Sequence, residues 1–168
     1  RIVRNVPGFV LDSGPHVREH AIEVLLPVVH RISATCQITA VTMSGGDDWN
    51  TISETAEKFA EILSAVPVDE RPFLLISSDL SHYIPAAEAK RRDGEVLRLL
   101  EQRRIEETYR LIERERISMC GGEPACLALE TLRRAGMLRQ VTCTGYTHSG
   151  MMTGDSSDVV GYAGLLVQ

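Results

Sequence analysis

The chain has 168 residues and a formal net charge of −5, with 43% hydrophobic and 24% charged residues. This length predicts a single domain that buries a core without disulfide or metal staples. The acidic balance argues against a nucleic-acid surface, which normally carries a basic excess. No stretch approaches the roughly 18 consecutive apolar residues of a membrane span, so neither nucleic acid nor a membrane is expected as a partner.

Cysteine usage predicts a reducing compartment. The four cysteines are widely spaced and form no C-x-x-C pair: Cys36, Cys120, Cys126 and Cys143. This spacing argues against both a four-thiolate zinc knuckle and a disulfide framework. We expect reduced thiols in a cytoplasmic protein, with all but Cys120 serving as small core residues.

The first half of the chain predicts helices alternating with a strand. Apolar residues recur at helical spacing over 16–32, where Pro27 should kink or end the helix. Residues 37–43 are rich in β-branched side chains and predict a buried strand. A turn with a helix N-cap signal follows at 44–48, and the next helix is predicted over 49–66.

The second half continues this alternation. Residues 72–76 are a continuous apolar run, typical of a strand in a sheet covered on both faces. A polar loop follows at 77–85. Two charged, amphipathic helices are then predicted over 86–101 and 105–116.

A small-residue loop at 119–122 precedes the last predicted helix. Pro124 stands where the first helical position is expected, and Gly136 lies just beyond the expected end at Arg134. The remaining strands are predicted at 140–146 and 159–167. Strands alternating with helices predict a layered α/β domain.

The strongest functional signal follows the apolar run 72–76, where the chain presents Ser77, Asp79 and His82. Open α/β sheets place their ligand crevices at the carboxyl ends of strands. Asp79 and His82 are three residues apart, so a turn would set a carboxylate beside an imidazole for proton transfer or metal ligation. The alternative is that Asp79 and Ser77 cap a helix while His82 is merely exposed.

A second signal is Cys120, which precedes the predicted helix N-terminus. The positive end of the helix dipole lowers the pKa of such a thiol and favours the thiolate. The adjacent Gly121 and Gly122 would let a ligand or metal approach the backbone closely. The alternative is a buried structural cysteine.

Residues 16–20 fit H-x-x-E-H, a zinc-peptidase pattern with two histidines on one helix. Gly14 and Pro15 place His16 at the frayed start of the helix, and no downstream glutamate ligand stands out. A peptidase is therefore disfavoured, although His20 alone could still reach a pocket. The polar loop at 146–157 could form the rim of that pocket or be a plain hairpin connection.

Four motifs in this order resemble the Memo family, which includes AmmeMemoRadiSam system protein B. They are EHAIE at 19–23, SSDLSHY at 77–83, CG at 120–121 and VVGY at 159–162. Memo proteins are similar to the class III extradiol dioxygenases, which cleave aromatic rings with a non-haem iron. The resemblance implies an α/β fold, a three-layer αβα sandwich with a central mixed sheet.

The resemblance also implies a site and a cofactor. His20 and Cys120 would be metal ligands for Fe(II) or copper, and His82 would be the catalytic acid/base with Asp79 close by. The family's first metal-binding histidine lies upstream in a Pro-His-Ala-Gly-type motif that nothing here matches. Residues 1–168 are therefore expected to be one Memo-like domain that lacks the family's N-terminal segment, about the last three-fifths of a member. One imidazole and one thiolate fall short of a three-ligand face for Fe(II).

Three functions follow from these residues. The first is an iron- or copper-dependent oxidoreductase acting on a small molecule or on O₂. The second is a non-enzymatic effector that binds a peptide or another ligand in the same pocket. The third is a hydrolase with Cys120 as nucleophile, His82 as base and Asp79 as orienter, which requires the imidazole within hydrogen-bond reach of the sulfur.

Overall fold

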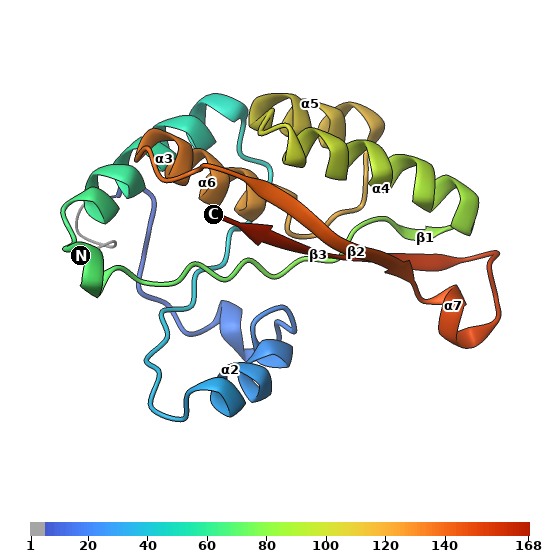
Figure 1. Cartoon of the computed structure of the whole chain (residues 1–168), viewed down its shortest axis with the longest axis horizontal. Helices are drawn as coiled ribbons and strands as arrows, with labels where there is room; N and C mark the ends of the chain where they lie inside the picture. Colours follow the sequence, from blue (N-terminus) through green and yellow to red (C-terminus); the bar gives the residue numbers. More distant parts are fainter. Residues whose placement is uncertain (1–5) are drawn as a thin grey trace.

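A three-stranded antiparallel sheet in the order β1–β3–β2 runs along the molecule (Figure 1). The strands are β1 (His82–Ile84), β2 (Val141–His148) and β3 (Val159–Val167). β2 and β3 form a long hairpin, paired from Val141 opposite Val167 to His148 opposite Gly161. The computed structural model describes residues 6–168. The largely apolar stretch at the start of the sequence, residues 2–10, lies partly outside them.

Helices supply most of the remaining structure. The 3₁₀ turns are η1 (Pro15–Val17), η2 (Glu23–Leu25) and η3 (Val68–Glu70), and the α-helices are α2 (Leu26–Ile32), α3 (Trp49–Ser64), α4 (Ala86–Glu101), α5 (Ile105–Glu115), α6 (Gly122–Arg134) and α7 (Gly150–Thr153). α4 contacts all three strands, α5 packs against α4 and α6, and α6 packs against α3. Figure 1 shows these four helices on one side of the strands and α2 on the other, apart from the sheet.

The core lies between these four helices and the sheet. Its fully buried members include Ile52 of α3, Val96 of α4 and Cys126 of α6. Burial of such side chains contributes about 1.5–3 kcal/mol for each large aliphatic group. Of the three cysteines expected in the core, only Cys126 is buried, because Cys36 is exposed and Cys143 is half-buried.

The predicted α/β class is confirmed, and so are the strongly periodic elements. Helix 86–101 and strand 159–167 have the bounds that the sequence predicts. The turn at 44–48 does cap a helix, because Asp48 Oδ1 accepts a hydrogen bond of 2.8 Å from the Thr51 N–H. The sheet is antiparallel throughout the described strands rather than mixed.

The single helix predicted over 16–32 is wrong. The segment consists of two 3₁₀ turns followed by α2, and Pro27 occupies the first turn of α2 instead of ending a helix. The first turn tolerates proline because its N–H groups have no acceptor within the helix. Apolar spacing alone did not reveal that the helix starts only at the proline.

The strands predicted at 37–43 and 72–76 are also wrong. Neither segment belongs to a helix or strand, and no backbone–backbone hydrogen bond joins either to another residue of the described range 6–168. Their apolar side chains reach solvent, with Phe73 85% and Ile38 54% exposed. A high β-propensity shows that a segment could join a sheet, but a strand also needs a neighbouring strand to which it can hydrogen-bond in register.

Within residues 6–168, no helix is long and apolar enough to cross a membrane.

Candidate functional site

The carboxylate of Asp79 lies at the centre of the candidate site. Its Oδ1 accepts a hydrogen bond of 3.0 Å from the Cys120 thiol, and its Oδ2 lies 2.7 Å from His82 Nε2. The Asp79 and His82 side chains are 30% and 20% exposed, so solvent reaches both. The structure therefore brings together three of the four residues that the sequence singled out.

Serine hydroxyls tie the Asp79 segment to its neighbours. Ser78 Oγ accepts a 2.9 Å hydrogen bond from the Gly121 N–H and donates to the Asp79 carbonyl oxygen at 2.5 Å. Ser77 Oγ donates to the Ala21 carbonyl oxygen at 2.6 Å, which joins the segment to the N-terminal part of the chain. These bonds hold the loop before α6 against the loop that carries Asp79.

Gly121 allows this close approach. A Cβ at position 121 would overlap Ser78 Cβ and lie 2.7 Å from the Ser77 carbonyl oxygen. Only a residue without a side chain fits there, and the Cys120 thiol reaches Asp79 as a result. The sequence suggested that the glycine admits a ligand, whereas in the structure it admits the neighbouring loop.

A β-bulge positions the imidazole. In β1, His82 pairs with Val160 and Ile84 pairs with Val159, so Tyr83 is the extra residue. Tyr83 has φ +55°, in the left-handed region that bulky residues rarely adopt, and it is 79% exposed. Its ring lies 5.8 Å from that of His82. The bulge keeps both flanking residues paired with β3 while the phenol ring reaches solvent beside the site.

The protonation states follow from the same contacts. Burial and the hydrogen bond to Asp79 both raise the pKa of the Cys120 thiol. Burial opposes ionisation of Asp79, but the hydrogen bonds from Cys120 and His82 outweigh it and lower the pKa of that carboxyl. The site therefore holds a neutral thiol beside a carboxylate. The prediction that the helix dipole favours the thiolate of Cys120 is wrong.

The hydrolase hypothesis loses its required contact. The thiol donates to Asp79, and in the described part of the chain no hydrogen bond joins the Cys120 sulfur to the His82 ring. Asp79 stands between sulfur and imidazole instead of behind the imidazole. A nucleophile–base pair is not formed by this arrangement.

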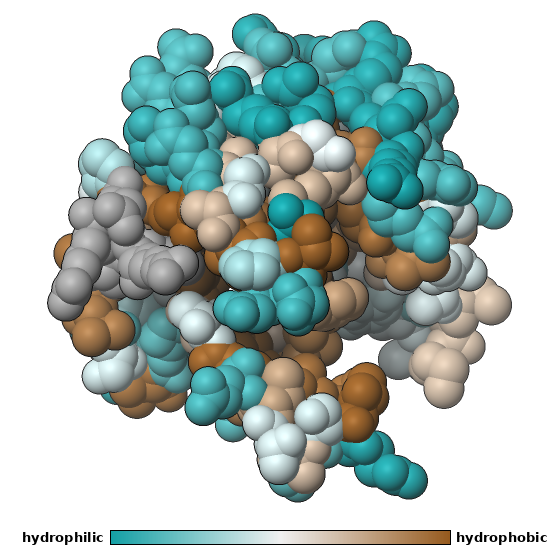
Figure 2. Space-filling model, turned by 60° about the vertical axis from the view of Figure 1, so that its left-hand side comes forward, coloured by the Kyte–Doolittle hydropathy of each residue, from teal (hydrophilic) through white to brown (hydrophobic). Residues whose placement is uncertain are grey.

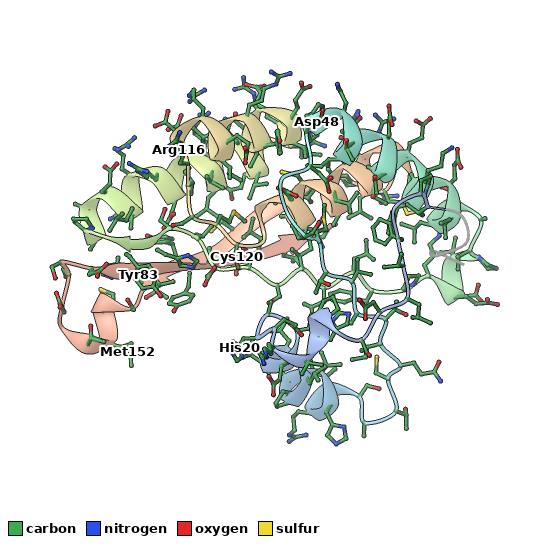
Figure 3. The ribbon with its side chains drawn as sticks, turned by 180° about the vertical axis from the view of Figure 1, so that it is seen from behind. His20, Asp48, Tyr83, Arg116, Cys120 and Met152 are labelled. Atoms are coloured by element: carbon green, nitrogen blue, oxygen red, sulfur yellow. The ribbon has the colours of Figure 1, made fainter. Side chains whose placement is uncertain are left out.

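His20 does not join the site. Its side chain is 86% exposed, and its Nδ1 lies 3.8 Å from Glu23 Oε2. Figure 3 shows His20 on the N-terminal part of the chain, near α2 and apart from Cys120. The H-x-x-E-H pattern is not on one helix either, because His16 is in η1, whereas Glu19 lies beyond it and accepts a 2.8 Å hydrogen bond from the Ile22 N–H.

The arrangement of these residues does not fit a metal ion. Across residues 6–168, no group of three or more His, Cys, Asp or Glu side chains could hold one. The sulfur of Cys120 is engaged by Asp79, and His20 points to solvent beside Glu23. His20 and Cys120 therefore do not converge among the described residues, and their role as a metal-ligand pair stays a prediction.

A small pocket of about 130 Å³ opens on the other side of Cys120. Its lining includes Met43, Met119 and Glu123. Glu123 Oε1 accepts a hydrogen bond of 2.7 Å from the Gly46 N–H, while its Oε2 is buried with no partner among the described residues. The loop at 44–48 is thus joined to the first turn of α6 beside the pocket, and Cys120 remains exposed.

The sequence reasoning missed Asp93. This residue of α4 is fully buried, and its Oδ1 accepts a hydrogen bond of 3.0 Å from the Ser81 N–H, between Asp79 and His82. The signal was present, because Asp93 interrupts the apolar face formed by Ala89, Val96 and Leu100. A carboxylate at a core-facing helical position indicates a buried polar contact.

Taken together, these features define an α/β protein whose site places one carboxylate between an imidazole and a thiol. The family model for Memo-like protein matches residues 2–166. The chain belongs to the Memo family.

Three curated relatives illustrate the match. A MEMO1 family protein of Aquifex aeolicus is 33% identical over 156 residues, covering 92% of this chain and 56% of that protein. One from Methanocaldococcus jannaschii is 33% identical over 162 residues, covering 94% and 55%. One from Methanosarcina acetivorans is 32% identical over 164 residues, covering 96% and 60%. The chain therefore spans a little over half the length of these relatives.

Proposed function

We propose that the cluster of Asp79, His82 and Cys120 is a proton-transfer site for a small molecule, within an oxidoreductase of dioxygenase-like architecture. The observation that carries this proposal is a single carboxylate in contact with both His82 Nε2, at 2.7 Å, and Cys120 Sγ, at 3.0 Å. The carboxylate orients the imidazole, and Nδ1 is the ring nitrogen that takes a proton from a ligand and returns it. This chain covers only a little over half the length of its relatives. The substrate and the turnover of the whole protein are therefore also part of this proposal.

The ligand that suits this site is a weakly acidic hydroxyl compound such as a catechol. The partial exposure of His82 gives such a ligand access to the imidazole. The raised pKa of Cys120 keeps the neighbouring sulfur neutral, so it does not repel the oxygen that loses its proton. Tyr83, whose ring lies 5.8 Å from that of His82, offers an aromatic surface beside it.

The proposed proton transfer runs through side chains alone. Fe(II) or copper remains the cofactor that the family resemblance implies, with His20 and Cys120 as its predicted ligands. No step is assigned to a metal, because these two side chains do not converge.

The chromogenic phenol 4-nitrocatechol tests the proposal, because its absorption spectrum changes when it ionises. We expect the protein to convert bound 4-nitrocatechol to its ionised form below the pH at which the free compound ionises. His82→Gln and Asp79→Asn should abolish this change. The matched control is His30→Gln, which alters an exposed histidine of α2 and should leave the change intact. A spectrum that is the same with and without wild-type protein contradicts the proposal.

A non-enzymatic binding function is the second candidate. Large apolar side chains are exposed at the far end of the β2–β3 hairpin, with Met151 71% and Met152 91% exposed. Figure 3 shows Met152 at that end of the molecule, beyond Tyr83. Exposed methionine and aromatic side chains are common on surfaces that bind peptides. Binding of an apolar peptide that Met152→Lys abolishes, without any ionisation of 4-nitrocatechol, would favour this candidate over proton transfer.

A further inference from the structure

A buried carboxylate lies directly behind the candidate site. Asp93 is 0% exposed, on the face of α4 that covers the sheet. Its Oδ1 accepts from the Ser81 N–H at 3.0 Å, and its Oδ2 accepts from the Tyr146 hydroxyl at 2.8 Å. Both oxygens are thus used, each by a donor from a different part of the fold.

The surrounding backbone is shaped around this carboxylate. A Cβ at Gly161 would collide with Oδ2 of Asp93 and lie 3.1 Å from its Cγ. Gly161 also exchanges two backbone hydrogen bonds of 2.9 Å with the site loop, accepting from the Leu80 N–H and donating to the Ser81 carbonyl oxygen. The carboxylate, the middle of β3 and the loop between Asp79 and His82 therefore meet at one point.

We propose that Asp93 is a positioning residue, which fixes the relative placement of Asp79 and His82 by holding the Ser81 N–H between them. The rest of the turn is held by the two backbone bonds to Gly161 and by the His82 N–H, which donates to Ser118 Oγ at 2.7 Å. The Ser81 hydroxyl is buried without a partner among the described residues, so the Ser81 backbone is held by its N–H and carbonyl groups. Tyr146 donates to the second carboxylate oxygen, so the Ser81 N–H has Oδ1 to itself. This inference gives the proposed proton-transfer site its support, and to that extent it rests on the proposed function.

The cost of an unpaired buried group explains why the contact is strong. A buried N–H that loses its acceptor pays its full desolvation penalty. The Ser81 N–H has no access to water as a replacement, because the residue is only 1% exposed. We therefore expect the loop to shift when Asp93 no longer accepts, and the His82 ring to lose its fixed orientation.

The experiment reads the His82 ring directly by ¹⁵N NMR, in the absence of any ligand. Wild-type protein should show one tautomer, with the proton on Nε2 facing Asp79. Asp93→Ala should give the averaged signal of a mobile ring, and Asp93→Asn should restore the single tautomer because the amide oxygen can still accept from Ser81. Tyr146→Phe leaves the Ser81 contact in place and should retain it. The matched control is Glu130→Gln, which changes a buried carboxylate of α6 outside the site and should leave the His82 signal unchanged.

Amide hydrogen exchange on the wild-type protein keeps the test decisive if Asp93→Ala does not fold. The Ser81 amide should exchange roughly tenfold or more slowly than that of exposed Tyr83. Equal exchange rates at these two amides would overturn the inference, and so would a single fixed tautomer in a folded Asp93→Ala variant. The 4-nitrocatechol experiment is separate: a failure there, with these NMR results as expected, overturns the proposed function and leaves the positioning role standing.

Discussion

Asp79 organises the site through one carboxylate that serves two partners. The thiol and the imidazole each contact a different oxygen, so neither partner displaces the other. This arrangement depends on close contact between two loops, which the missing side chain at Gly121 permits. Adding a single methyl group at position 121 should therefore be enough to alter the geometry of the site.

Gly121→Ala should separate the two loops. The added Cβ would overlap Ser78 and crowd the Ser77 carbonyl oxygen, so we expect a loss of about 1–3 kcal/mol in the free energy of unfolding. Urea unfolding measures this loss, and mass spectrometry of alkylated protein should show faster modification of Cys120. The matched control is Gly94→Ala in α4, where a Cβ meets no atom within 4 Å and should stabilise the helix by about 0.5–1 kcal/mol. Equal effects of the two substitutions would contradict the packing argument.

Metal retention is predicted to be poor for these 168 residues. Because His20 and Cys120 do not converge, we expect the chain to lose added Fe(II) or copper on desalting. Elemental analysis of the desalted protein measures this. One equivalent of metal that disappears in both His20→Ala and Cys120→Ser would show instead that the two ligands come together.

The residue types at the site were predictable, and their geometry was only partly so. An apolar run followed by Ser77, Asp79 and His82 indicated a site, and the structure does bring Asp79, His82 and Cys120 together. The Cys120 pKa was predicted in the wrong direction because the helix dipole was weighed without burial of the thiol and without its hydrogen bond to Asp79. The helical pattern shows that Asp93 faces the core, but its partners Ser81 and Tyr146 are distant in sequence, so no local pattern identifies them.

At the scale of elements, amphipathic helices were predicted best because each has a partner that buries its apolar face. α5 packs on α4 and α6, and α4 packs on the sheet, so periodicity and structure agree. The segments 37–43 and 72–76 show the opposite case, because β-branched and apolar composition cannot reveal whether a partner strand is present. The sequence also could not give the strand order, which pairings between distant residues determine.

A cluster of ion pairs around the buried carboxylate of Glu130 joins α6 to α3. The Glu130 side chain in α6 is 2% exposed and accepts hydrogen bonds from Arg133 at 2.7 Å and from Arg134 at 2.8 Å. Arg134 also donates to Ser53 Oγ of α3 at 2.6 Å. Burial opposes ionisation of Glu130, but the two guanidinium groups outweigh it and lower the pKa of the carboxyl.

Stability should depend on pH through this cluster. The folded-state pKa of Glu130 lies below its ordinary value of 4.5, so its contribution is complete above that pH and disappears as the pH falls through the folded value. We expect Glu130→Gln to cost about 1–3 kcal/mol near neutral pH and much less in acid. Urea unfolding at about pH 7 and about pH 3 measures the difference. Glu106→Gln removes an exposed ion pair with Arg110 and should cost less than about 0.5 kcal/mol at either pH, so a similar pH dependence in both variants would contradict this assignment.

At the scale of the whole molecule, apolar surface is the most unusual feature. Figure 2 shows hydrophobic surface reaching solvent in the middle and lower part of one face, below an almost entirely hydrophilic upper rim. The exposed apolar side chains include Phe73, Leu74 and Leu75 of the extended segment 72–76. An extended, apolar segment without a partner strand is a template for pairing between chains.

Phe73→Lys should suppress self-association without affecting stability. The side chain is 85% exposed, so the free energy of unfolding should change by less than about 0.5 kcal/mol. Light scattering on gentle heating should fall, because a charge interrupts the segment. Val17→Lys is the matched control, since Val17 is 76% exposed but belongs to the 3₁₀ turn η1. If both variants scatter light equally, the extended segment is not the site of association.

The shared carboxylate also governs how the site sulfur meets oxidants. Peroxide attacks the ionised form of cysteine, and burial together with the hydrogen bond to Asp79 keeps Cys120 in the uncharged form. The Cys120 sulfur therefore reacts slowly with peroxide while its thiol donates a hydrogen bond to Asp79. A ligand that breaks the hydrogen bond between Asp79 and Cys120 should favour the thiolate. We therefore expect oxidation of Cys120 by peroxide to increase when the site is occupied.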